Sequence, residues 1–160
     1  MLYSLIYSLT DTFTYSGENT LDALVTRVLT KSLIKTNGVL DVNDFRQSYI
    51  TFMTTPGSHN DTYAGMIPIL PINLFTHALT HLLSLIGTCH RMFFKNYVEN
   101  KSPEKCPDND GHNVDAIDAL MTVPVTTIAM IDKDRDARLE AVKNAIQVTR
   151  RTTGSHSLSH

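Results

Sequence analysis

This 160-residue sequence contains few cysteines and no clusters of one charge sign, and its first residues lack the basic region of a signal peptide. The two cysteines, Cys89 and Cys106, are too few for the disulfide framework of a small secreted domain, and neither belongs to a CxxC pair typical of zinc or redox sites. The net charge is -2 and the Lys and Arg residues are scattered, so no basic surface is expected to attract nucleic acid. The first 15 residues are partly apolar, but without a basic region they make a poor signal peptide. We therefore predict a reduced, cytoplasmic protein that does not bind nucleic acid.

Strand-like alternation is also lacking, whereas apolar residues at helical spacing are common. The stretch after Thr20 predicts a helix that stops at Asn37-Gly38, since it carries Leu21, Leu24, Val25, Val28 and Leu29. Asp41 is expected to cap a second helix, which should break at residues 54–57. Two amphipathic helices joined by a short turn indicate helical packing.

Further helices are predicted in the second half of the chain. Residues 91–98 have a helical pattern, and residues 114–123 have another, which Pro124 should end or kink. The last helix is expected to start at the cap Asp134 and to place three apolar side chains on one face, namely Leu139, Val142 and Ile146. The sequence thus predicts an all-α fold.

Residues 64–89 contain no Asp, Glu, Lys or Arg and approach the length of a membrane span. Pro68, Pro71 and several polar residues interrupt this run, which argues against a membrane partner on hydropathy grounds. Membrane association nevertheless stays open as a third hypothesis, which recovery of the protein in the soluble fraction would exclude.

The segment CPDNDGHNVDAIDALMTVPVTTIA, residues 106–129, gathers acids around a glycine turn before a predicted helix. Such a turn offers backbone N–H groups to an anion, while carboxylates can hold sugar hydroxyls or a hydrated cation. The alternative is a capped helix start with solvated acids, because Asx-rich turns often precede helices. Local chemistry alone leaves both interpretations open.

A resemblance to a known family comes from three segments in order. These segments are similar to ADP-ribosylglycohydrolases, and especially to the branch related to J1 crystallins. In chain order they are YSGENTLDALVTRVLTKSL, DGHNVDAIDALMTVPVTTIA and a predicted helix that ends in VTRRTTGSH. The resemblance implies an all-α, partial orthogonal helical bundle of the ADP-ribosylglycohydrolase type. It also implies one partial domain over residues 1–160, with residues 65–87 as a possible insertion.

In enzymes of this family a TDDT motif before a helix contributes to a site for two magnesium ions. Residues 16–20, Ser-Gly-Glu-Asn-Thr, occupy the matching place, so the resemblance implies Glu18 and Thr20 as metal ligands. Gly17 and Asn19 cannot supply the paired carboxylates expected of a magnesium centre. The alternative is that Asn19 or Thr20 simply caps the helix.

The resemblance also implies a substrate site for ADP-ribose or an ADP-ribosylated substrate. The family's central glycine loop matches residues 111–124, which makes Gly111, His112, Asn113 and Asp115 the expected ligand contacts. His156 occupies about the place of a later His-containing loop. The family's late DTD-type metal motif is not found in this sequence, so hydrolysis is expected to be weak or absent.

Two functional hypotheses follow from these residues. The first is an ADP-ribosylglycohydrolase-type hydrolase that uses magnesium, with the catalytic residues themselves unknown. The second is a non-enzymatic descendant, either a crystallin-like structural protein or an ADP-ribose-binding protein. The changed SGENT motif favours the second for the molecule as it stands.

Residues 65–87 differ in composition from the family-like segments on either side, so we interpret them as an insertion, from a retained intron or a gene-model error. Sequencing of the mature transcript is expected to find no codons for these residues. A transcript that contains them would contradict the intron interpretation, and the protein would then have to bury their apolar surface.

Overall fold

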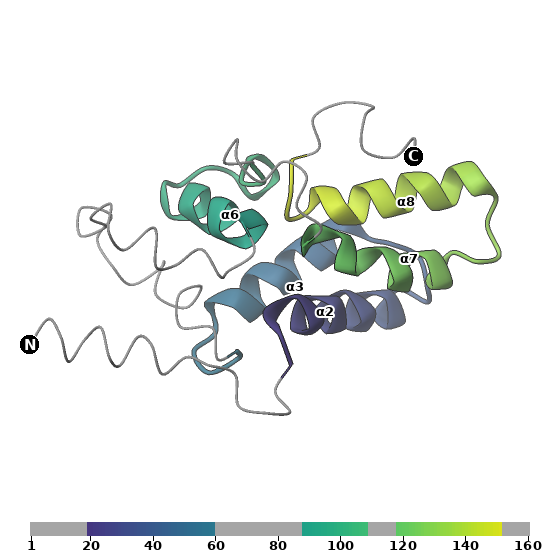
Figure 1. Ribbon diagram of the computed structural model, residues 1–160, viewed down its shortest axis with the longest axis horizontal. Helices are drawn as coiled ribbons and strands as arrows, with labels where there is room; N and C mark the ends of the chain where they lie inside the picture. The colour runs from purple at the N-terminus through teal and green to yellow at the C-terminus, as the bar shows by residue number, and fades with distance from the viewer. Residues whose placement is uncertain (1–18, 60–87, 109–117, 152–160) are drawn as a thin grey trace, which may run out of the picture.

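The computed structural model describes residues 19–59, 88–108 and 118–151, and every regular element in these ranges is helical (Figure 1). The α-helices are α2 (Leu21–Lys35), α3 (Val42–Thr54), α6 (Thr88–Val98), α7 (Val123–Ala129) and α8 (Arg135–Gln147). Two short 3-10 helices are η2 (Pro103–Lys105) and η3 (Asp118–Thr122). The predicted all-α class is therefore confirmed over the described ranges. Most of the uncharged run, including residues 65–87, falls outside them.

Helix α2 begins and ends where its sequence signals predict. The Thr20 hydroxyl accepts a hydrogen bond from the backbone N–H of Ala23 at 3.3 Å, so Thr20 is the N-cap. At the other end Asn37 and Gly38 have φ values of 55° and 84°. This left-handed backbone lets the Gly38 N–H reach the Leu33 carbonyl at 2.7 Å, which ends the helix.

Helix α3 is capped by Asp41, as predicted, and packs against α2. The Asp41 carboxylate accepts from the backbone N–H groups of Asn43 and Asp44 at 2.9 and 3.0 Å. The Asp44 carboxylate in turn accepts from the Ser32 hydroxyl at 2.7 Å and pairs with Lys35, both on α2. These contacts tie the start of α3 to the end of α2.

Pro124 lies in the first turn of α7, so the prediction that it ends or kinks a preceding helix is wrong. A proline is tolerated there because the first N–H groups of a helix have no intrahelical partner to lose. The predicted helix over residues 114–123 is replaced, in its described part, by η3.

Helix α8 starts at the predicted cap, where Asp134 accepts from the Ala137 N–H at 2.8 Å. Val142 and Ile146 are buried, whereas Leu139, which was predicted to lie on the same face, is 41% exposed. The first turns of α8 lie beside the turn that joins α7 to α8 (Figure 1), and Ile128 and Ile131 near this turn are exposed as well.

The main core is aromatic and lies where α2, α3 and α6 meet. Its largest fully buried side chains include Phe45 and Tyr49 from α3 and Phe93 and Phe94 from α6. The Tyr49 and Phe93 rings meet edge to face with centroids 5.1 Å apart, an arrangement favoured by aromatic quadrupoles. A smaller cluster of Cys89, Val142 and Ile146 joins α6 to α8.

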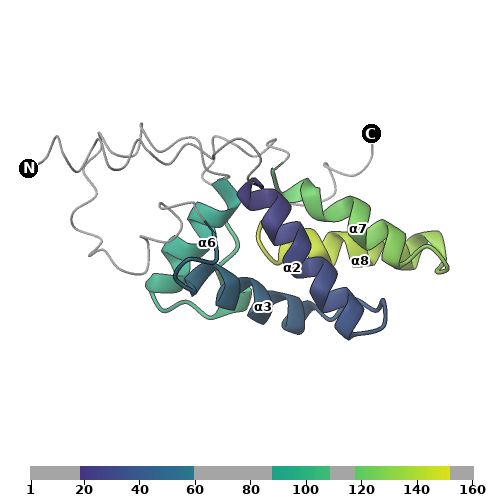
Figure 2. The same ribbon diagram turned by 90° about the horizontal axis from the view of Figure 1, so that it is seen from below.

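Helices α2 and α7 run away from one end of the described part, and α3 and α8 run back toward it (Figures 1 and 2). The start of α2, the end of α3, the start of α6 and the η3 segment before α7 all lie toward one end of the described part. The opposite end holds the turn between α2 and α3 and the turn between α7 and α8. Segments distant in sequence are therefore brought together at a single place.

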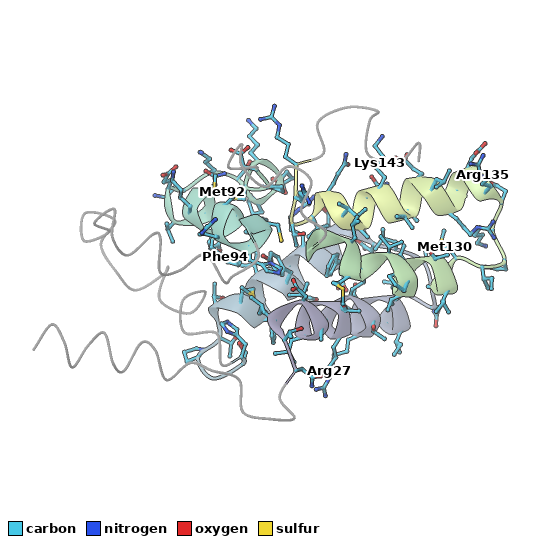
Figure 3. All side chains as sticks on the ribbon, viewed as in Figure 1. Arg27, Met92, Phe94, Met130, Arg135 and Lys143 are labelled. Carbon is cyan, nitrogen blue, oxygen red and sulfur yellow. The ribbon has the colours of Figure 1, made fainter. Side chains whose placement is uncertain are left out.

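Some of the charged side chains of the described helices extend outward. Arg27 and Arg135 extend away from the helix bodies, whereas Phe94 is enclosed (Figure 3). Of the helices in the described ranges, none combines the length and the apolar character that a membrane crossing requires.

The aromatic core predicts a large stability difference between two substitutions. Phe93→Ala is expected to lower the free energy of unfolding by about 3–5 kcal/mol, because the ring is fully buried and its removal leaves a cavity. Ile128→Ala is the control, because this side chain is 68% exposed. It should change the free energy of unfolding by about 0.5 kcal/mol or less. Urea unfolding of both variants measures the two values. Similar losses for the two would contradict the assigned core.

Candidate functional site

The candidate site lies where the first turns of α2 and α6 meet η3. The Thr26 hydroxyl is 2.9 Å from the Asp22 carbonyl oxygen, one turn earlier on α2, and 3.2 Å from the Met121 carbonyl oxygen on η3. One hydroxyl therefore bridges two segments that are 95 residues apart in sequence. This contact fixes the second turn of α2 against η3.

A chain of hydrogen-bonding groups leads from this place into the core. The Asp22 carboxylate Oδ1 lies 3.2 Å from His90 Nε2, and His90 Nδ1 lies 2.8 Å from the Tyr49 hydroxyl. Tyr49 and His90 are buried, whereas the Asp22 side chain is 30% exposed. The chain thus joins a fully enclosed phenol to a carboxylate that solvent reaches.

The amphipathic pattern of α6 explains why His90 is buried. His90 precedes Phe93, Phe94 and Tyr97 by three, four and seven residues, so all four share a helix face that packs into the core. An imidazole without partners would be costly in such surroundings. Tyr49 and Asp22 each supply a hydrogen-bond partner for one nitrogen of the His90 ring, which offsets the cost of burying the ring.

The protonation of His90 reflects these neighbours. Burial by itself lowers the pKa of the imidazole, but Tyr49, Cys89 and the hydrogen bond to Asp22 favour the charged form and raise the pKa well above its ordinary value. A charged ring donates from both nitrogens, to the Tyr49 oxygen and to Asp22. Burial also raises the pKa of Tyr49, so its hydroxyl stays protonated.

Of the site residues implied by the family resemblance, the structure describes Thr20 alone. Thr20 is the N-cap of α2, which agrees with the alternative that this residue caps the helix. The other expected residues, Glu18, Gly111, His112, Asn113, Asp115 and His156, lie outside the described ranges. Their place in a site therefore remains a prediction.

Magnesium prefers an octahedral shell of oxygen ligands that includes carboxylates. The Thr20 hydroxyl oxygen already accepts the capping hydrogen bond, and the Asp22 Oδ1 atom faces His90. Among the residues that the structure describes, no three His, Cys, Asp or Glu side chains are grouped as metal ligands would be. The described donors alone therefore do not fit a magnesium ion.

Sequence reasoning did not single out the Asp22, His90 and Tyr49 chain. One signal was present, because His90 is an ionisable residue on an otherwise apolar helix face. A buried histidine at such a position needs polar partners from neighbouring elements. The sequence offered no means of choosing Asp22, which is 68 residues away.

Both cysteines are free and buried, in agreement with the expected absence of a disulfide framework. Burial raises the pKa of the Cys106 thiol, so this group is a poor nucleophile at neutral pH. Cys89 lies beside His90 but is enclosed with it. Neither cysteine is positioned for catalysis.

Comparison of the chain with protein-family models, curated proteins and solved structures gave no significant match to any of them.

The His90 pKa predicts how stability changes with pH. Because the folded pKa lies above the unfolded value of 6.5, the contribution of His90 is fully present below pH 6.5 and is lost as pH rises through the folded pKa. The free energy of unfolding should therefore fall as pH rises above 6.5. In His90→Gln, which cannot titrate, this fall should shrink. Urea unfolding across the range measures both proteins, and parallel curves would contradict the assigned protonation.

Proposed function

We propose that this chain is an ADP-ribosylglycohydrolase-like protein that binds ADP-ribose or ADP-ribosylated substrates, and that it hydrolyses them weakly or not at all. The fold is proposed to be a partial orthogonal bundle of that family's type, with residues 65–87 as an insertion. The resemblance of the ordered sequence segments is the origin of the proposal.

The observation that carries the proposal is the contact between α2 and η3. The SGENT motif, residues 16–20, directly precedes α2 in sequence, and residues 111–113 lie shortly before η3 in sequence. The Thr26 hydroxyl joins the two elements through the Met121 carbonyl. A site shared by these two motifs requires such proximity, because neither motif alone surrounds a ligand.

The electrostatics of this place support an anionic ligand. The α2 and α6 helices both begin here, and the positive ends of helix dipoles favour phosphate groups. The Asp22 carboxylate adds an acceptor for sugar hydroxyls. A molecule with both a pyrophosphate and ribose groups matches this combination.

Weak hydrolysis is proposed from the altered motif. Gly17 and Asn19 stand where the family's enzymes have carboxylates, so the resemblance gives Glu18 as the remaining acidic ligand of this motif. Water activated by two bound magnesium ions depends on those ligands. Binding of ADP-ribose does not require the same pair of carboxylates, so we expect binding to outlast catalysis.

A thermal melt of the full chain tests the binding. ADP-ribose at about a hundredfold excess over its Kd should stabilise the chain by about 2.7 kcal/mol, which raises Tm by several degrees. Asn113→Ala and Asp115→Ala should abolish the shift. Asp136→Ala, an exposed acid on α8, is the control and should retain it.

The same samples are incubated with an ADP-ribosylated peptide and magnesium to measure release of ADP-ribose. A Tm shift with little release is the expected result. No Tm shift with ADP-ribose, with or without magnesium, would contradict the proposed function and favour a purely structural, crystallin-like protein.

A further inference from the structure

We propose that the apolar groove between α2 and α7 is a docking site for an acidic amphipathic helix of another protein. The partner is defined by its chemistry, namely a row of apolar side chains flanked by Asp or Glu. The residues that line this groove are different from those of the candidate site, so the inference does not depend on the proposed function.

The groove is formed where the second half of α2 runs beside α7 (Figure 1). Its volume is about 360 Å³. The turn after α2 comes close to the end of α7, since a Cβ added at Gly38 would lie 3.6 Å from the Ala129 carbonyl oxygen. The other lining residues are apolar except for one threonine, and they are Thr30, Leu33, Ile34, Val125 and Ile128.

Several apolar side chains around the groove are exposed. Ile34 on α2 is 73% exposed and Ile128 on α7 is 68% exposed. Val39 and Ile131, which follow these two helices in sequence, are 57% and 71% exposed. Among the large apolar side chains of the described ranges, these four are the most exposed. Exposed apolar side chains gathered from two elements mark an interaction surface, whereas scattered ones do not.

The charges beside the groove are positive on one side and absent on the other. Arg27 and Lys31 are exposed on α2, one turn apart, and neither forms an ion pair with a described residue. On the α7 side, residues 119–131 contain no charged residue, and Asp132, which follows, pairs with Lys133. A partner with carboxylates along one flank complements this pattern.

The shape and charge of the groove favour a protein helix over other occupants. Apolar side chains at spacings of three and four residues form a ridge that enters such a groove. Basic membrane sites use clusters of about 4–8 cations, many more than Arg27 and Lys31 supply. A second copy of the chain would bring two further cations into the interface without acids to match them.

Binding of synthetic peptides to the full chain tests the proposal. The probe is a fluorescent peptide of about 14 residues, about four helical turns, with Leu along one face and Glu along the flanks. A second peptide has Lys in place of each Glu. Fluorescence anisotropy is expected to show that the Glu peptide binds about tenfold more tightly than the Lys peptide.

Substitutions in the groove locate the bound peptide. Ile34→Ser and Ile128→Ser should each weaken binding of the Glu peptide about tenfold, because each removes an apolar side chain that docking would bury. Leu139→Ser is the matched control, since this side chain is also exposed but does not line the groove, and it should leave the Kd unchanged. Circular dichroism checks that all three variants are folded.

Charge reversal tests the acidic character of the partner. Lys31→Glu should weaken the Glu peptide about fivefold and should tighten the Lys peptide. Lys143→Glu makes the same change of net charge on α8 and should alter neither Kd. Figure 3 shows Lys143 on the opposite side of the helices from Arg27.

Absence of binding, equal affinity for the two peptides, or affinity unaffected by both Ile34→Ser and Ile128→Ser would overturn the proposal. A photoreactive side chain at position 128 of the full chain tests the other occupants. Cross-links to residues 64–87 of the same chain, or to a second copy, would overturn the proposal in favour of that occupant. Binding to phosphatidylserine vesicles that is lost in Ile128→Ser would overturn it in favour of a membrane.

Discussion

Burial of one imidazole constrains much of the described structure. His90 is enclosed by the aromatic core, and its two ring nitrogens face Tyr49 on α3 and Asp22 on α2. Because a buried polar group without partners is costly, these contacts fix how three helices meet. The second turn of α2 lies beside η3, through the contact of Thr26 with Met121. Packing of the core and the geometry of the candidate site therefore depend on one set of contacts.

The ends of the helices were predicted correctly from the sequence where a single capping residue determines where the helix begins or ends. Thr20 and Asp41 cap helices, Gly38 ends one, and Asp134 starts the last, each through a backbone hydrogen bond within a few residues. Pro124 was misplaced because a proline can end one helix or begin the next, and the sequence pattern around it permits both.

Contacts between distant segments could not be predicted in the same way. The Asp22 and His90 pair and the Thr26 and Met121 contact depend on how the helices pack, which periodicity does not determine. The family resemblance implied metal ligands within residues 16–20 and substrate contacts at residues 111–115, but it named neither Asp22 nor His90. Leu139 shows the limit of arguments from helix faces, since it has the same spacing as the buried Val142 and Ile146 on α8 yet is 41% exposed.

The central claim is that ADP-ribose binds where the start of α2 meets η3. The most direct measurement is titration of the isotope-labelled chain with ADP-ribose, followed by the backbone amide shifts in NMR spectra. The account predicts that the largest changes occur in the first turn of α2 and in η3, Asp118–Thr122. Changes concentrated elsewhere, for example at η2, Pro103–Lys105, or no changes at all, would contradict it.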